Sequence, residues 1–183
     1  EDFFISDYVD HKKLKSVLKM VKNDNIKFYQ ILVQLIRQSW EKGKPYKGNK
    51  HIHIIPRNKR YGINLQAAIW EKEFLEKTIG EGNYNAWSFE VMQLGTENYN
   101  VGKIEFLIDD RNLLNIIHTV VQSKYLPKAL RLLKRKGHNI NPAEREVLGG
   151  IENLKYQLKL LMYSFTPGFL VKPAKAIGRI LKI

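Results

Sequence analysis

The first forty residues place apolar side chains at the spacing of amphipathic helices. In residues 10–22, Leu14, Val17 and Val21 fall on one side of a helix, and lysines occupy the other side. Residues 26–41 carry a broader apolar face, and polar residues separate the two segments. The pattern predicts two helices, and the width of the second apolar face indicates a core helix.

Later segments change to the pattern of β-strands. A β-branched run that Pro56 ends predicts a strand over residues 51–56. Residues 87–92 and 101–108 flank a turn-rich stretch, and the second of these segments alternates apolar with polar residues. Residues 87–108 are therefore expected to form a β-hairpin.

Helical spacing returns in much of the remaining chain. The segments that show it are residues 64–79, 109–122, 126–136 and 141–163. Asp109 or Asp110 is expected to cap the second of these helices. Asn141-Pro142-Ala143-Glu144 combines Asn at the cap, Pro in the first turn and Glu three residues on, which predicts the start of the last helix.

The order of these elements contains no alternating strand–helix repeat, which favours an α+β fold. We expect a small antiparallel sheet, made of hairpin 87–108 plus strand 51–56, with helices packed around it and a helix-rich C-terminal half. Residues 1–163 are expected to form a single domain. Residues 164–183 are expected to form a basic amphipathic tail.

The charge of the chain is strongly positive and unevenly distributed. The 31 Lys and Arg residues exceed the 18 Asp and Glu residues, for a formal net charge of +13. Residues 42–60 hold seven basic residues and residues 124–136 hold six, and neither segment contains an acid, whereas residues 61–110 are rich in acids. Charge in such blocks is typical of proteins that bind polyanions. The absence of cysteine excludes disulfides. It fits a reducing compartment such as the cytoplasm, and it also fits a secreted domain that must cross membranes unfolded, so the localisation is unknown.

The first basic block contains the candidate catalytic residues. His51 and His53 lie two residues apart in the predicted strand, so their side chains point to the same face. Two imidazoles on one face can hold a divalent metal or act as acid and base in phosphodiester cleavage. Lys50 and Arg57 are the nearby cations that would stabilise the charged phosphorus intermediate. Two exposed histidines on an edge strand are the alternative interpretation.

Cations and a tyrosine near these histidines, together with cations of the second basic block, are the candidate nucleic-acid-binding residues. Cationic side chains neutralise phosphates, and tyrosine rings stack on unpaired bases. The predicted set is Lys44, Lys47, Lys59, Arg60, Tyr61, Lys124, Lys128, Arg131 and Arg135. An ordinary solvated helix face is the alternative for the members beyond residue 123.

Two short motifs resemble those of known nuclease families. His51-Ile52-His53 resembles the His-hydrophobic-His element with which replication and relaxase nickases hold a divalent metal, and Tyr125-Leu126-Pro127-Lys128 is similar to their catalytic Tyr-x-x-Lys. Arg111-Asn112 followed by His118 is similar to the Arg–polar–His signature of all-α ribonuclease domains. These matches cover few positions and assign the chain to no family.

The expected function is that of a basic domain that acts on nucleic acid, with RNA preferred over DNA. One version is a toxin-like endonuclease that uses the paired histidines, without a cofactor or with a divalent metal. The alternative is a non-catalytic module, such as a ribonucleoprotein component, a viral matrix protein or a protein of membrane surfaces. An acidic protein is a further expected partner, and a membrane surface would be reached through the tail.

Overall fold

A computed structural model of the chain consists of two compact units. Unit 1 comprises residues 1–9, 34–40 and 114–183, and unit 2 comprises residues 10–33 and 41–113. The described residues are 3–31, 43–56, 62–83, 85–86, 88–89, 106–141 and 143–165, and for 162–165 only the backbone is considered.

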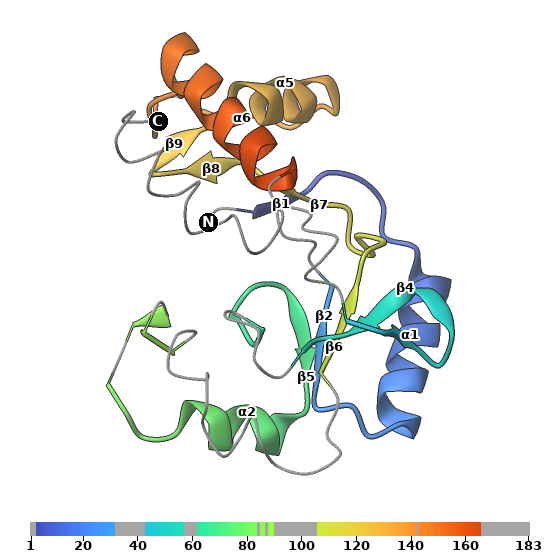
Figure 1. Cartoon of the computed structure of the whole chain (residues 1–183). Helices are drawn as coiled ribbons and strands as arrows, with labels where there is room; N and C mark the ends of the chain where they lie inside the picture. Colours follow the sequence, from blue (N-terminus) through green and yellow to red (C-terminus); the bar gives the residue numbers. More distant parts are fainter. Residues whose placement is uncertain are drawn as a thin grey trace. The chain divides into compact units, whose positions relative to one another are not determined.

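Unit 2 is built on a five-stranded mixed sheet (Figure 1). Its strands are β2 (Phe28–Gln30), β3 (Pro45–Tyr46), β4 (Asn49–Ile54), β5 (Ala68–Trp70) and β6 (Phe106–Asp109). Their spatial order is β3-β4-β6-β2-β5, in which β2 and β6 run parallel and the other neighbours run antiparallel. The expected α+β class is confirmed, whereas the expected purely antiparallel sheet is wrong because β2 is inserted parallel to β6.

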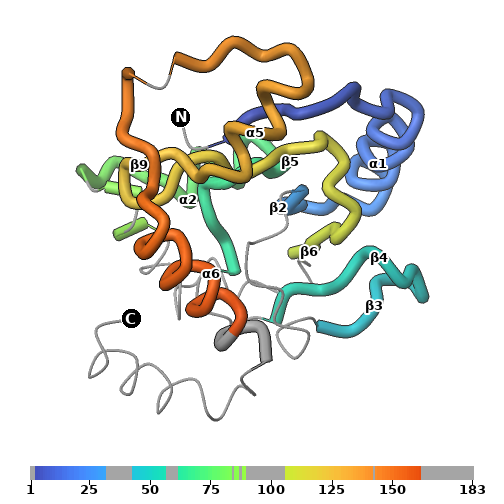
Figure 2. Tube along the Cα trace, turned by 90° about the horizontal axis from the view of Figure 1, so that it is seen from above, coloured from blue at the N-terminus to red at the C-terminus, as the bar shows by residue number. Residues whose placement is uncertain are grey.

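Two helices lie on opposite sides of this sheet (Figures 1 and 2). Helix α1 (His11–Asn23) begins after Asp10, whose carboxylate accepts hydrogen bonds from two backbone N–H groups of the first turn. Helix α2 (Lys72–Ile79) is capped in the same way by Glu71. Phe74 of α2 packs with Phe28 and Phe106 in the aromatic core on one face of the sheet.

Unit 1 contains two two-stranded sheets, one formed by distant segments of the sequence and one formed by a hairpin. Strand β1 (Phe3–Ile5) pairs antiparallel with β7 (Ile116–His118), and β8 (Val120–Val121) forms a hairpin with β9 (Lys124–Tyr125). Gln122 and Ser123 both have positive φ, as a two-residue type I′ turn requires.

Two helices complete unit 1 among the described residues. Helix α5 (Pro127–Arg135) starts with Pro127 in its first turn, where a missing N–H costs nothing. Helix α6 (Gly150–Phe165) starts where the Glu152 carboxylate accepts a hydrogen bond from the Gly149 N–H, as in half of a capping box. Leu126, Ala129 and Leu148 form the apolar core, against which Tyr156 packs.

Several expected elements are confirmed. Helix α1 matches the helix predicted over residues 10–22, α5 matches residues 126–136, and β4 matches the strand predicted over residues 51–56. Residues 164–165 continue helix α6, while residues 166–183 lie outside the described ranges, so the predicted basic tail stays a prediction. The single-domain expectation for residues 1–163 stays a prediction as well.

Other expected elements are wrong, either entirely or over part of their length. Strand β2 occupies part of the helix predicted over residues 26–41, and strands β7 and β8 replace the helix predicted over residues 109–122. The helix predicted from residue 141 begins only at Gly150. Strand β5 takes the middle of the segment 64–79, and α2 takes its end.

The predicted hairpin 87–108 is observed only at its end. Residues 106–108 belong to strand β6, which pairs with β4 and β2. Phe89 donates a backbone hydrogen bond of 3.0 Å to the Asn85 carbonyl, which is a helical turn in place of the expected strand. Residues 90–105 lie outside the described part of the chain.

Candidate functional site

The two predicted histidines lie on strand β4 of unit 2. Because side chains alternate along a strand, His51 and His53 share one face, as expected, and Ile52 is buried on the other. The two rings differ in exposure: the His51 side chain is 42% exposed and that of His53 is 11% exposed. Of these two histidines, His51 is the one whose imidazole is open to a dissolved ligand.

Asp110 joins the two histidines from the adjacent strand end. The register of β4 with β6 places Ile52 opposite Asp109, and the Asp110 N–H donates to the His51 carbonyl at 3.1 Å. The His51 Nδ1 atom lies 3.0 Å from Asp110 Oδ1, and His53 Nε2 lies 3.8 Å from Asp110 Oδ2. A carboxylate on Nδ1 favours the tautomer in which Nε2 of His51 can accept a proton.

His53 is held in a more enclosed setting. Its residue is 8% exposed, and neither ring nitrogen has a hydrogen-bond partner among the described residues. At 3.8 Å, its Nε2 is too far from Asp110 for a hydrogen bond. The structure thus separates the predicted pair into an open histidine held by a carboxylate and a buried one.

A buried polar network supports this strand end from the opposite face. Asp109 is fully buried and accepts a 2.6 Å hydrogen bond from the Tyr29 hydroxyl. The Arg111 guanidinium donates two further hydrogen bonds to its carboxylate, at 2.9 and 2.6 Å. Burial alone would raise the pKa of Asp109, but the hydrogen bonds from Arg111 and Tyr29 outweigh it and lower that pKa. Asp109 is therefore an ionised structural group that fixes the position of its neighbour Asp110.

The remaining predicted residues of the first basic block have mixed settings. Lys44 and Lys50 are exposed, and strand alternation places Lys50 on the face opposite His51. Lys47 is bound to Asp24 at 2.7 Å, and the Tyr46 hydroxyl is bound to the same carboxylate at 3.0 Å. The positive charge of the β3–β4 hairpin is thus partly balanced within unit 2. The predicted residues Arg57, Lys59, Arg60 and Tyr61 lie outside the described ranges.

The second basic block forms an exposed row on helix α5 of unit 1. Spacings of three, three and one residues place its cations along one side of the helix, while Ala129 and Leu133 are buried on the other. We call these cations the α5 row: Lys128, Arg131, Lys134 and Arg135. The four side chains of the row line one surface hollow. Lys134 was not among the sequence candidates, although its place in the 3–4 spacing would have identified it.

The flanking cations of this block are balanced by carboxylates. Lys124 forms ion pairs with Glu152 at 3.0 Å and with Glu146 at 3.4 Å, and Lys136 is paired with Asp7. Within the described ranges no such pair involves a member of the α5 row. Among the described residues, the row is therefore the part of the second block whose positive charge no carboxylate balances.

The two motif resemblances are not accompanied by the expected geometry. Tyr125 is a buried strand residue of unit 1, whereas a nickase tyrosine would lie on a helix. His118 lies in strand β7 with its ring at 4.5 Å from that of Phe3, and it is not on the helix that the ribonuclease resemblance requires.

Over the described ranges, no group of three His, Asp or Glu residues has the geometry to hold a metal ion. None of the helices seen there combines the length and apolar content needed to cross a bilayer. No protein-family model, curated protein or solved structure matches this chain.

Proposed function

We propose that this protein binds single-stranded nucleic acid, preferably RNA, through the α5 row. The observation that carries the proposal is the unbalanced charge of four cations on one exposed helix face. Each cation that meets a phosphate releases counterions, which is the main source of affinity in such complexes.

The surroundings of the row favour an unpaired strand over a duplex. Lys128 also lines a pocket of about 240 Å³ between α5 and α6, with Leu126, Ala129 and the aromatic ring of Tyr156 in its wall. A cation beside an apolar and aromatic hollow suits a strand whose bases are free to turn toward the protein. Bases stacked inside a duplex cannot enter such a hollow.

Titration of a fluorescein-labelled single-stranded RNA, followed by anisotropy, tests this proposal. In the variant K128Q/R131Q/K134Q/R135Q we expect weak residual binding and a salt dependence of log Kd that is shallower by about 3, from four contacts at about 0.7 each. The matched control is K12Q/K15Q/K19Q/K22Q, which removes the same charge from four exposed lysines of α1. Equal losses in both variants would mean that only net charge matters, which would overturn the proposal.

RNA cleavage at His51 is a second candidate function, and the His51–Asp110 pair favours it. In this reaction His51 Nε2 would take the proton of a 2′-hydroxyl, and the resulting oxygen would attack the adjacent phosphorus to form a 2′,3′-cyclic phosphate. The bond from phosphorus to the 5′-oxygen would break, and this leaving oxygen would take a proton from water. Asp110 would hold the reactive tautomer at its 3.0 Å contact.

Cleavage is tested by incubating labelled RNA and, separately, plasmid DNA with the protein, with and without EDTA. The variants H51A and D110N are expected to lose cleavage of RNA, whereas H53A loses less because its ring is enclosed. Absence of any cleavage by the unaltered chain would leave the binding function alone.

A further inference from the structure

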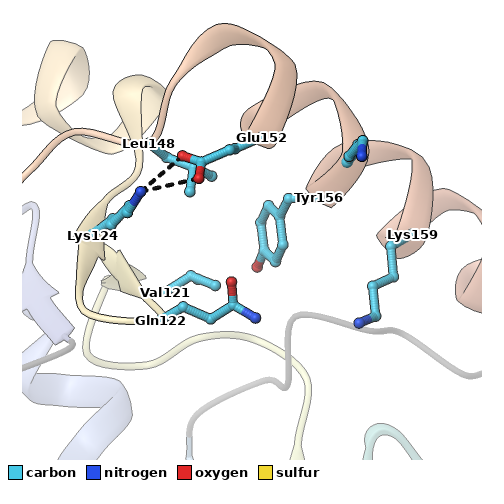
Figure 3. A pocket seen from close by; sticks show the side chains of 8 residues that line it. Val121, Gln122, Lys124, Leu148, Glu152, Tyr156 and Lys159 are labelled. Atoms are coloured by element: carbon cyan, nitrogen blue, oxygen red, sulfur yellow. Dashed lines mark hydrogen bonds and ion pairs between the residues drawn. The ribbon is translucent and has the colours of Figure 1, made fainter. Parts of the chain in front are cut away.

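A second pocket of unit 1 combines features that suit one small ligand class (Figure 3). It has a volume of about 320 Å³ and lies between the β8–β9 turn and helix α6. Ligand pockets in proteins begin at about this size. The residues that line it are Val121, Gln122, Lys124, Leu148, Glu152, Lys155, Tyr156 and Lys159.

One wall of this pocket is fixed by ion pairs. Lys124 binds both oxygens of Glu152, at 3.0 and 3.1 Å, and Glu152 also accepts the Gly149 N–H that starts α6. The hydrogen bond from Lys124 lowers the pKa of Glu152, so the pair stays ionised at neutral pH. The charges of this wall balance each other and hold α6 against the β8–β9 hairpin.

The rest of the pocket has unused polar groups. The Tyr156 hydroxyl is buried and has no hydrogen-bond partner in the described part of the chain. Burial raises the pKa of Tyr156, so the hydroxyl keeps its proton and can donate it in a hydrogen bond. Figure 3 shows this hydroxyl directed toward the side of Gln122, with Lys159 extending from α6 toward the same region.

Positive charge at the rim is not balanced. Lys155 and Lys159 are one helical turn apart, both are exposed, and no ion pair with another described residue involves them. Val121 and Leu148 supply apolar surface in the same pocket. A ligand that fits these features would combine a flat, partly apolar ring that has polar edges with a compact anionic group.

We propose that this pocket binds one nucleotide, with the phosphate on Lys155 and Lys159 and the base against Val121, Leu148 and Tyr156. The Tyr156 hydroxyl and the Gln122 amide would then bind the polar edge of the base. The nucleotide can be one unit of a bound RNA, in which case this inference rests on the proposed function. It can also be a free nucleotide, which has the same chemistry. Lysine suits the phosphate because its ammonium acts as a compact point charge.

The direct test is calorimetric titration of the full chain with 5′-AMP and 5′-UMP, beside adenosine and inorganic phosphate as half-ligands. We expect saturable binding of the nucleotides, weaker binding of each half-ligand, and at least a tenfold rise of Kd in K155Q/K159Q. The control K15Q/K19Q removes an equivalent pair of lysines from α1 and should leave Kd unchanged.

Y156F distinguishes a binding role from a structural one. Loss of one hydrogen bond should raise the nucleotide Kd about threefold to tenfold. The same change removes a buried polar atom without a partner, so the melting temperature should stay the same or rise. Weaker binding in a protein of equal or greater thermal stability supports the proposal.

The outcomes separate this inference from the proposed function. No saturable nucleotide binding, or an unchanged Kd in K155Q/K159Q, would overturn the pocket while RNA binding through the α5 row still holds. Nucleotide binding without RNA binding would support the pocket for a free nucleotide and reject the proposed function.

Discussion

Helix α5 and the β3–β4 hairpin are both rich in lysine, but their surroundings differ. In the hairpin, Lys47 is bound to Asp24, and the ring of Tyr46 is buried with its hydroxyl on the same carboxylate. In the α5 row, the cations lie on an exposed face without a described carboxylate partner. The positive charge is therefore partly balanced by a carboxylate in the hairpin, whereas no carboxylate among the described residues balances it in the α5 row.

The buried charges of unit 2 extend this contrast. Asp109, Tyr29 and Arg111 form a closed network whose charged groups are satisfied by each other. Next to this network, the His51–Asp110 pair has a half-exposed imidazole ring. The charges of this network are held by one another, whereas the cations of the α5 row are exposed.

Removal of the buried carboxylate should have the largest effect. Asp109→Ala leaves the Arg111 guanidinium and the Tyr29 hydroxyl without their partner, so the free energy of unfolding should fall by about 3–5 kcal/mol. Urea denaturation followed by circular dichroism measures it. Asp24→Ala, which breaks the ion pair with the exposed Lys47 ammonium and one hydrogen bond from the Tyr46 hydroxyl, is the control and should cost less. Equal losses would remove the distinction between the network and the hairpin pair.

Acid should reveal the same network. The pKa of Asp109 is lowered in the folded protein, so its stabilisation is complete above the ordinary carboxyl pKa and is lost as pH falls through the lower, folded value. Urea denaturation at a series of pH values from about 6 to about 2 should show a steeper loss in the parent than in Asp109→Ala. Parallel curves would indicate that Asp109 is not ionised in the folded state.

Substitution of a single cation in each basic region should affect RNA binding differently. Arg131→Gln should weaken RNA binding and make the dependence of log Kd on log salt shallower by about 0.7, the value of one phosphate contact. Lys47→Gln should leave that dependence unchanged because its ammonium is already bound to Asp24. Anisotropy at several KCl concentrations measures both, and a larger effect for Lys47 than for Arg131 would reverse the comparison.

The smallest expected effect concerns the turn before α5. Ser123 has a φ of 64°, a left-handed conformation that glycine adopts without steric cost. Ser123→Gly should therefore raise the free energy of unfolding by up to about 1 kcal/mol, in thermal or urea denaturation. RNA affinity should not change, since no cation is altered. Destabilisation would show that the serine side chain has a structural role.

The sequence pattern was sufficient where an element needs only local interactions. Helix α1 has a capping Asp10 and a clear apolar side, and α5 has Pro127 at its start with apolar residues at helical spacing. Strand β4 was also predicted, because Ile52, Ile54 and Ile55 are β-branched and Pro56 ends the run. These signals are present within one segment of chain.

Long-range pairing decided the elements that the pattern missed. Strand β2 is hydrogen-bonded on both sides and all three of its residues are buried, so its sequence lacks the alternation of apolar and polar residues that predicts a strand. The apolar residues after Asp110 have helical spacing, but Asn112 and Asn115 adopt positive φ and Ile116–His118 pairs with β1. The local sequence cannot predict that a strand pairs with a segment more than a hundred residues away.

The candidate site was predictable in part for the same reason. The spacing of His51 and His53 correctly placed them on one face, but the carboxylate that joins them comes from the end of β6. The α5 row follows from helical spacing alone, whereas the pairing of Lys124 with Glu146 and Glu152 depends on where α6 packs.

The most direct test of RNA binding by the α5 row is photo-crosslinking of the unaltered chain. A single-stranded RNA that contains 4-thiouridine would be crosslinked at moderate salt, digested and mapped by mass spectrometry. We predict that crosslinked peptides include residues 127–135 and that excess unlabelled RNA competes them away. Crosslinks confined to residues 44–50, or none that RNA competes away, would contradict the assignment of the binding surface to α5.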